Sequence, residues 1–173
     1  FDVYLTDDGS SDGTADAVKT EFPEVNILQG NGNLYWVGGM RLAFAASIQK
    51  DYDYYLWLND DTILESDAIE RLFLVNKKLS EQTDKDLIIV GTTKDIITGI
   101  ASYGGSIKSQ KWYSNKYNFL GCTEYIEQCD TFFGNCVLIS RNVVKKVGNI
   151  DPAFIHSMGD TDYGLRAKKQ NCS

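Results

Sequence analysis

The sequence predicts an α/β domain in which helices flank a doubly wound, mixed and mainly parallel sheet. Short runs of β-forming residues alternate with helical segments along the 173 residues. One of these runs is followed directly by two aspartates and another by an asparagine and two aspartates. Turn-forming glycine, serine and asparagine separate runs from helices. The length suits one domain spanning residues 1–173. Ligands of such sheets bind beyond the carboxyl ends of the strands, so the acidic pairs stand where a site is expected.

The first half of the chain is predicted to alternate three strands with three helices. The strands are residues 1–6, 25–28 and 54–58, and the helices are residues 15–22, 40–49 and 68–79. Pro23 closes the first helix, and four glycines make residues 30–39 a predicted loop. The run at 54–58 is almost wholly apolar, which is typical of a central strand buried on both faces.

The second half is predicted to hold two further strands and two further helices. A buried strand is expected at 87–90 and another from about 135, with helices at 141–147 and 160–169. Residues 97–128 are rich in glycine, tyrosine and serine and are predicted to form hairpins and an irregular segment. Trp57, in the 54–58 run, is expected in the core.

Composition excludes several classes of function. The net charge of −7 argues against nonspecific binding to nucleic acid. Four cysteines without a Cys-x-x-Cys pair, and a single histidine, disfavour structural zinc and favour reduced thiols in a cytoplasmic protein. No apolar stretch reaches the roughly 18 residues that span a bilayer.

The turn at residues 7–14 carries the strongest functional pattern. Glycine and capping residues alone would describe a polar strand-to-helix turn, but they do not explain adjacent carboxylates at Asp7 and Asp8. A carboxylate in that position can accept the imide N–H of a uracil or thymine ring. The turn therefore predicts a nucleotide site, with Ser10 beside it.

Two later clusters extend this hypothesis. Asn59, Asp60 and Asp61 follow the most buried strand, where carboxylate and amide oxygens suit Mg²⁺ or Mn²⁺ that shares substrate phosphates. A solvated turn is the plainer alternative. Asp160 and Asp162 open the last helix, where they would also complement its dipole. Asp160 is a candidate general base for an acceptor hydroxyl.

The order of four motifs resembles a family 2 glycosyltransferase of the GT-A fold. The motifs are Asp-Asp-Gly-Ser-Ser-Asp-Gly-Thr from residue 7, Trp-Leu-Asn-Asp-Asp-Thr from residue 57, Gly-Asn-Cys-Val-Leu-Ile-Ser-Arg from residue 134, and Gly-Asp-Thr-Asp-Tyr-Gly-Leu-Arg from residue 159. Residues 32–43 are similar to the rhamnosyltransferase-like branch. The resemblance implies inverting transfer of a hexosyl or deoxyhexosyl group from a UDP- or dTDP-sugar to a hydroxyl, in bacterial-type polysaccharide or glycan synthesis.

The resemblance also implies roles for individual residues. Asp7, Asp8, Ser10, Arg41 and Asp60 are expected to bind the nucleotide. Asn59 and Asp61 match the ends of the Asp-x-Asp metal motif, with asparagine replacing the first aspartate. Asp160 matches the base of a Glu-Asp motif in which Gly159 replaces the glutamate. The residues expected near the acceptor are His156, Asp162 and Trp112.

The resemblance further implies a fragment. Family members begin with a central strand and a helix before the first motif and usually continue past the last helix, so we expect a domain truncated at both ends. The expected partners are a nucleoside diphosphate sugar and a glycan or lipid-linked acceptor, at the inner face of a membrane with peripheral association. A nucleotidyltransferase and a noncatalytic module that binds nucleotide sugars or polysaccharides stay open as alternatives.

Overall fold

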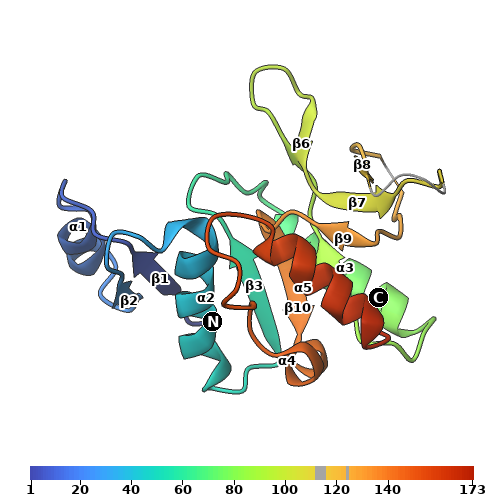
Figure 1. Ribbon diagram of the computed structural model, residues 1–173. Helices are drawn as coiled ribbons and strands as arrows, with labels where there is room; N and C mark the ends of the chain where they lie inside the picture. Colours follow the sequence, from blue (N-terminus) through green and yellow to red (C-terminus); the bar gives the residue numbers. More distant parts are fainter. Residues whose placement is uncertain (112–115, 124) are drawn as a thin grey trace. The chain divides into compact units, whose positions relative to one another are not determined.

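The computed structural model describes residues 1–111, 116–123 and 125–173 (Figure 1). Trp112, expected near the acceptor, lies outside these residues. The chain divides into two compact units: Phe1–Tyr52 with Asn149–Gly159, and Asp53–Gly148 with Asp160–Ser173. We call these unit 1 and unit 2. That residues 1–173 form a single domain stays a prediction.

Unit 1 is built around a β-α-β arrangement. Strand β1 (Tyr4–Asp7) and strand β2 (Asn26–Gln29) pair in parallel, and helix α1 (Thr14–Glu21) connects them. Helix α2 (Tyr35–Ile48) packs on β1, where the Thr6 hydroxyl donates to the Gly39 carbonyl at 2.8 Å. Val37 and Phe44 are buried on this helix. This packing fixes the turn that follows β1, which carries Asp7 and Asp8.

Unit 2 has a three-stranded sheet at its centre. Strand β10 (Cys136–Ser140) lies between β3 (Tyr54–Leu58) and β4 (Ile88–Val90) and is antiparallel to both. Helix α3 (Ala68–Ser80) covers a core cluster that includes Leu72, Ile89 and Leu138. Trp57 is only 2% exposed and packs against Phe132 and Tyr163, which confirms its predicted place in the core.

Among the residues that the structure describes, the remaining elements are two helices and five short strands. The helices are α4 (Arg141–Val147) and α5 (Gly159–Lys169). The strands are β5 (Thr93–Lys94), β6 (Ala101–Tyr103), β7 (Gly105–Lys108), β8 (Tyr117–Phe119) and β9 (Thr131–Phe132). Strands β5 and β6 form a projecting hairpin, and β7 pairs with both β8 and β9 (Figure 1).

Two predictions need correction. The sheet is not mainly parallel: among the described residues only β1 and β2 pair in parallel, because β10 inserts in the opposite direction between β3 and β4. The predicted loop at 30–39 is also too long, since α2 begins at Tyr35 and includes two of its glycines. A Cβ at Gly38 would lie 3.0 Å from the Leu34 Cβ, so this glycine allows close packing inside a helix.

The described part of the chain has no helix that is both long and apolar enough to cross a membrane.

Candidate functional site

Asp7 ends β1 with a carboxylate that is held by its own turn. Its residue is 6% exposed, and Oδ1 accepts the Ser10 N–H at 3.0 Å. Hydrogen bonds from the Ser10 side chain and backbone lower the pKa of Asp7 below its ordinary value, because they favour the ionised form. Asp7 is therefore a charged group with a fixed orientation at the end of the strand.

Both carboxylate oxygens of Asp8 accept hydrogen bonds from the loop before α2. Its Oδ1 accepts the Gly32 N–H at 2.8 Å, and its Oδ2 accepts the N–H groups of Leu34 at 2.7 Å and Tyr35 at 3.2 Å. These donors lie at the start of α2, where backbone N–H groups lack partners within the helix. The carboxylate thus satisfies the helix start from a residue more than twenty positions earlier.

The loop before α2 is packed tightly against Asp8. A Cβ on Gly30 would lie 2.3 Å from Asp8 Oδ1, and Gly9 and Gly32 adopt positive φ angles of 85° and 83°. Only glycine reaches these conformations at little cost. The acidic pair predicted from the sequence is thus integral to the loop structure, and its contact with a nucleotide base stays a prediction.

Two other predicted residues lie in unit 1. Arg41 is half-buried, and its Nε is a buried donor that has no hydrogen-bond partner among the described residues. His156 is exposed and its ring contacts that of Tyr35 in a tilted arrangement, with centroids 3.9 Å apart and an interplanar angle of 46°. Tyr35 has a positive φ of 53°, an uncommon conformation for a bulky residue. A buried guanidinium donor without an acceptor is costly, which makes Arg41 a candidate for an anionic ligand.

The turn after β3 presents its carboxylates to solvent. Asp60 and Asp61 are exposed, whereas Asn59 is half-buried. The Asn59 N–H donates to the Asn135 carbonyl at 3.2 Å, and its own carbonyl accepts the Thr62 N–H at 3.2 Å. In the described part of unit 2, neither the Asp60 nor the Asp61 carboxylate takes part in a hydrogen bond or ion pair. These two side chains are therefore available to a ligand.

Asp160 is oriented by two backbone donors. Its Oδ2 accepts the Gly134 N–H at 2.9 Å, and its Oδ1 accepts the Thr161 N–H at 2.7 Å. Gly134 is followed by Asn135, whose carbonyl holds the Asn59 turn. The two-residue segment Gly134–Asn135 therefore contacts both the candidate base and the candidate metal turn. Within unit 2, the structure brings these two predicted groups to the same end of β3 and β10.

Asp162 and Gly159 have structural explanations of their own. Asp162 forms an ion pair with the Arg166 Nε at 2.6 Å, one turn along α5, and Arg166 also donates to the Val147 carbonyl. A Cβ on Gly159 would lie 2.7 Å from a Val37 methyl carbon and 3.0 Å from one of Ile150. Packing thus accounts for the absence of a glutamate at position 159.

The side chains near Asp61 fit a hard cation only in part. No group of three or more histidine, cysteine, aspartate or glutamate side chains within 1–111, 116–123 and 125–173 forms a metal site. The oxygens of Asn59 and Asp61 are the donor type that Mg²⁺ and Mn²⁺ take when phosphate and water complete the shell. The donor set therefore suits a cation that arrives with a diphosphate.

An aromatic cluster lies beside the candidate base, and sequence reasoning pointed to Tyr103 in it but missed Phe119 and Phe133. The rings of Tyr103 and Phe119 each lie edge-on to that of Phe133, at centroid distances of 5.8 and 6.5 Å. All three residues are 37–46% exposed. Phe133 directly precedes Gly134, the donor to Asp160. The alternation in Phe132-Phe133 could have revealed it, since Phe132 is buried and Phe133 points outward.

Comparison with known proteins extends these observations. The family model described as Glycosyl transferase family 2 matches residues 1–148. No curated protein matches the sequence. The matched range includes the Asp7–Asp8 turn, the Asn59–Asp61 turn and the Gly134–Asn135 segment, and it ends before Asp160. The chain belongs to glycosyl transferase family 2.

Proposed function

We propose that this chain catalyses inverting transfer of a hexosyl or deoxyhexosyl group from a UDP- or dTDP-sugar to a hydroxyl acceptor. Membership of the family supports glycosyl transfer in general. The observation that carries the finer proposal is the orientation of Asp160 by the Gly134 and Thr161 N–H groups. The Gly134–Asn135 segment links this carboxylate to the turn that holds Asp61.

Asp160 is the proposed general base. The acceptor oxygen attacks the anomeric carbon, the bond from that carbon to the nucleoside diphosphate breaks, and the hydroxyl proton passes to the carboxylate. Attack on the face opposite the leaving group inverts the configuration. A positioned base contributes about 10²–10⁴-fold to such a step. The two N–H donors fix the direction of the carboxylate, which is what this role requires.

Asn59 and Asp61 would hold Mn²⁺ or Mg²⁺ in this proposal. Asp61 supplies an exposed carboxylate and Asn59 an amide on a turn that is anchored to Asn135. When bound, such a cation stabilises the charge of the departing diphosphate. Asp60 is assigned to the nucleotide, because its carboxylate is exposed on the same turn.

Recognition of the nucleotide in unit 1 is assigned to Asp7, Asp8, Ser10 and Arg41. Asp7 is oriented by Ser10, and its second oxygen can meet the imide N–H of uracil or thymine. Asp8 supports this role mainly through the loop that it holds. The unsatisfied Nε of Arg41 favours an anionic partner such as a phosphate.

The acceptor is assigned to the aromatic cluster near Asp160. Exposed ring faces stack on the apolar face of a sugar, which favours a glycan or a lipid-linked glycan. Phe133 is the best placed, since Gly134 follows it. His156, Asp162 and Trp112 are further candidates, although Asp162 is paired with Arg166. A peripheral place at the cytoplasmic face of a membrane would suit a lipid-linked acceptor.

The test compares Asp160→Asn with Asp84→Asn in the full-length protein, using UDP- and dTDP-sugars and a panel of glycan acceptors. We expect Asp160→Asn to lower transfer by at least about 10²-fold while UDP or dTDP binding changes less than about twofold. Asp84→Asn, an exposed and equal change of charge, should leave both unchanged. Unimpaired transfer in Asp160→Asn would remove the residue from this role. Metal-dependent binding without any transfer by the unaltered protein would favour the noncatalytic module.

A further inference from the structure

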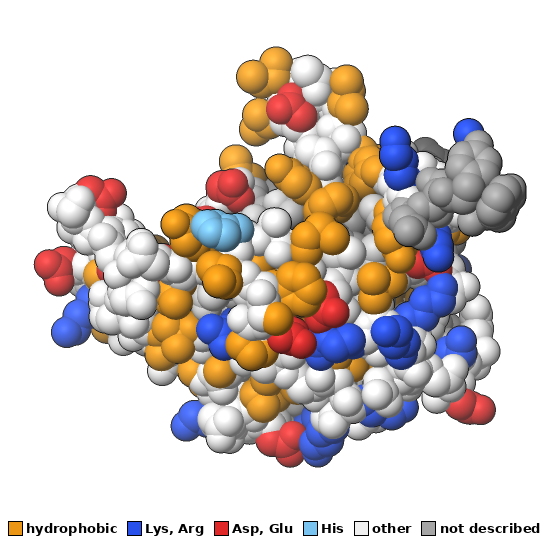
Figure 2. Space-filling view, viewed as in Figure 1, with side chains coloured by type: hydrophobic (Ala, Val, Ile, Leu, Met, Phe, Trp, Pro, Cys, Tyr) orange, Lys and Arg blue, Asp and Glu red, His pale blue; other side chains and the backbone are white. Residues whose placement is uncertain are grey.

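Positive charge is concentrated in the last part of an acidic chain. Residues 104–173 carry nine lysines and arginines against six acidic residues, a net charge of +3. Residues 1–103 carry eight basic and eighteen acidic residues, a net charge of −10. Figure 2 shows lysine and arginine side chains gathered on the side of unit 2 that holds α5, β7 and β8. This surface can attract an anion that the rest of the chain would repel.

A groove with a volume of about 450 Å³ opens on this surface. It is lined by Lys108, Tyr117, Asp130, Leu165, Lys168 and Lys169. Lys108 belongs to β7 and Tyr117 to β8, and these two residues are paired in the sheet. Lys168 and Lys169 form the last turn of α5. Three ammonium groups thus share one concave surface with a single carboxylate.

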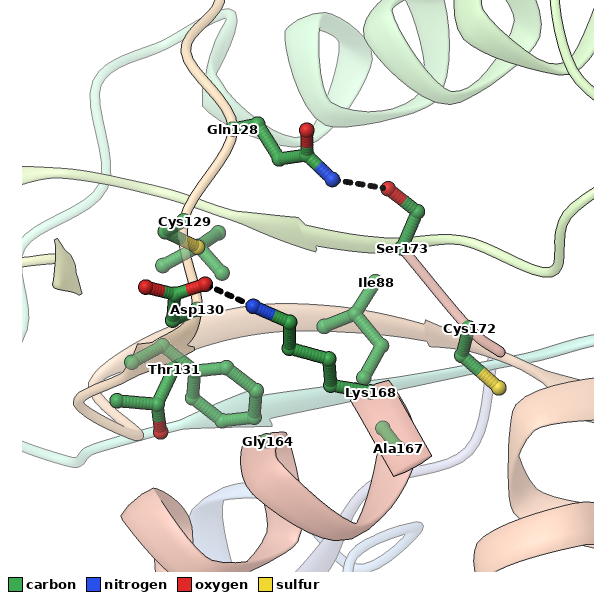
Figure 3. Close-up of a pocket in the computed structure, with 12 residues that line it drawn as sticks. Ile88, Gln128, Cys129, Asp130, Thr131, Gly164, Ala167, Lys168, Cys172 and Ser173 are labelled. Carbon is green, nitrogen blue, oxygen red and sulfur yellow. Dashed lines mark hydrogen bonds and ion pairs between the residues drawn. The ribbon is translucent and has the colours of Figure 1, made fainter. Parts of the chain in front are cut away.

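Asp130, the single carboxylate that lines the groove, already has partners within the protein. Asp130 accepts the Lys108 backbone N–H at 2.7 Å and forms an ion pair with the Lys168 ammonium, which Figure 3 shows beside the neighbouring small cavity. Lys108 and Lys169 form no ion pair with any carboxylate in the described part of the chain. Two ammonium groups in the groove are therefore available to a ligand, while Asp130 holds the third in place.

Strand β8 and helix α5 each contribute residues both to the groove and to the surroundings of the candidate base, Asp160. Tyr117 lines the groove, and Phe119 lies two residues along β8, on the same face of the strand. Phe119 contacts Phe133, which precedes the residue that holds Asp160. Along α5, Lys168 lies about 12 Å from Asp160 at the rise of an α-helix. An extended acceptor that presents a hydroxyl to Asp160 can therefore reach the lysines.

We propose that this groove binds an anionic group, a carboxylate or a phosphate, carried by the acceptor glycan at a distance from the hydroxyl that reacts. The proposal rests on the proposed transfer function and adds to it the charge of the acceptor. Lys108 and Lys169 provide the attraction, Lys168 is positioned by Asp130, and Tyr117 and Leu165 offer apolar contact to a sugar ring.

The experiment measures binding to the full-length protein without any transfer step. The probes are an oligogalacturonate, a malto-oligosaccharide of equal length, glucose 1-phosphate and vesicles of phosphatidylglycerol. The test variant is Lys108→Gln with Lys169→Gln, and the charge-retaining variant is Lys108→Arg with Lys169→Arg. The control is Lys77→Gln with Lys78→Gln, which removes the same charge from the exposed side of α3.

We expect the oligogalacturonate to bind, and the uncharged oligosaccharide to bind at least about tenfold more weakly, because only the former has carboxylates for the lysines. The measurement is made at low salt, since ions screen exposed charge pairs. The glutamine variant should lose about tenfold in affinity for the anionic probe, and the control and arginine variants should keep it. Equal losses in the glutamine variant and the control, or equal binding of the charged and uncharged oligosaccharides, would overturn the proposal. Binding of vesicles without binding of oligogalacturonate or glucose 1-phosphate would overturn it in favour of a membrane surface.

Donor binding and transfer to neutral acceptors are measured on the same samples. If the groove binds anions but no acceptor receives a sugar, the proposed function fails and not the anion site. If transfer proceeds and the glutamine variant keeps full affinity and full transfer to acidic acceptors, the anion site fails and the proposed function stands.

Discussion

The turns that follow β1 and β3 contain the same chemistry and use it in opposite ways. After β1, Asp8 gives both carboxylate oxygens to backbone N–H groups of a distant loop. After β3, Asp60 and Asp61 are exposed and make no hydrogen bond or ion pair with the described residues. Asp8 holds the loop before α2 in place, whereas Asp60 and Asp61 are available to a ligand. Two adjacent aspartates at the end of a strand therefore do not by themselves indicate whether the pair supports the fold or binds a ligand.

The largest effect is expected from Asp8→Ala. Removing this carboxylate leaves three N–H groups without their acceptor, and we expect a loss of about 2–3 kcal/mol in the free energy of unfolding. Asp61→Ala should change it by less than about 0.5 kcal/mol, as is usual for exposed positions. Urea denaturation of both variants measures the difference. Similar losses in the two would erase the contrast between the turns.

A second effect comes from the glycine beside Asp8. Gly30→Ala places a methyl group 2.3 Å from Asp8 Oδ1, and we expect it to destabilise the protein by about 2 kcal/mol. Gly121→Ala is the matched control, because a Cβ there meets nothing within 4 Å. Thermal or urea unfolding compares them. If Gly30→Ala were as stable as the control, the loop would not depend on this contact.

The turn after β3 is tested by ligand binding instead of stability. Asp61→Ala should weaken the Mn²⁺-dependent part of UDP or dTDP binding by about tenfold or more, since it removes the proposed protein ligand. Glu70→Ala, an exposed change of equal charge in α3, should bind as the unaltered protein does. Calorimetry with and without Mn²⁺ measures both. Metal-dependent binding that survives in Asp61→Ala would assign the cation to other groups.

The smallest effect is a dependence of stability on pH at Asp7. Its pKa is lowered in the folded protein by the Ser10 hydrogen bonds, so the unfolded chain binds more protons as the pH falls below about 4. This stabilisation is present at a pH above the pKa of Asp7 in the unfolded chain. It is lost as the pH falls through the pKa of Asp7 in the folded protein. Asp7→Asn should therefore lose less stability than the unaltered protein between about pH 5 and pH 3. Urea unfolding at several pH values measures this, and parallel profiles would contradict it.

Local patterns were sufficient to predict most elements, but not how the strands pair. The strand at 54–58 and the helix at 141–147 match their observed bounds. The direction of β10 could not be predicted, because periodicity shows that a strand is buried and not which way its neighbours run. The start of α2 was missed because Gly38 and Gly39 suggested a loop. In the helix, a Cβ on Gly38 would lie 3.0 Å from the Leu34 Cβ, and the Gly39 carbonyl accepts the Thr6 hydroxyl.

The candidate site was predictable as a set of residue types and not as a set of contacts. The sequence pointed to Asp61 and Asp160, and unit 2 brings the Asn59 turn and Asp160 to adjacent residues of the Gly134–Asn135 segment. It could not show that Asp8 is engaged by Leu34, because the partner lies 26 residues away. The groove at Lys108 and Lys169 also escaped prediction, since 61 residues separate its two walls.

The close packing of Gly159 limits how this chain could change. A carboxylate at that position would need room now filled by Val37, which is fully buried, and by Ile150. Gly159→Glu alone should therefore lower the unfolding midpoint, and a prior Val37→Ala should lower it as well through a cavity. Both single steps lead through less stable proteins, so an acidic neighbour for Asp160 is reached only by concerted substitution.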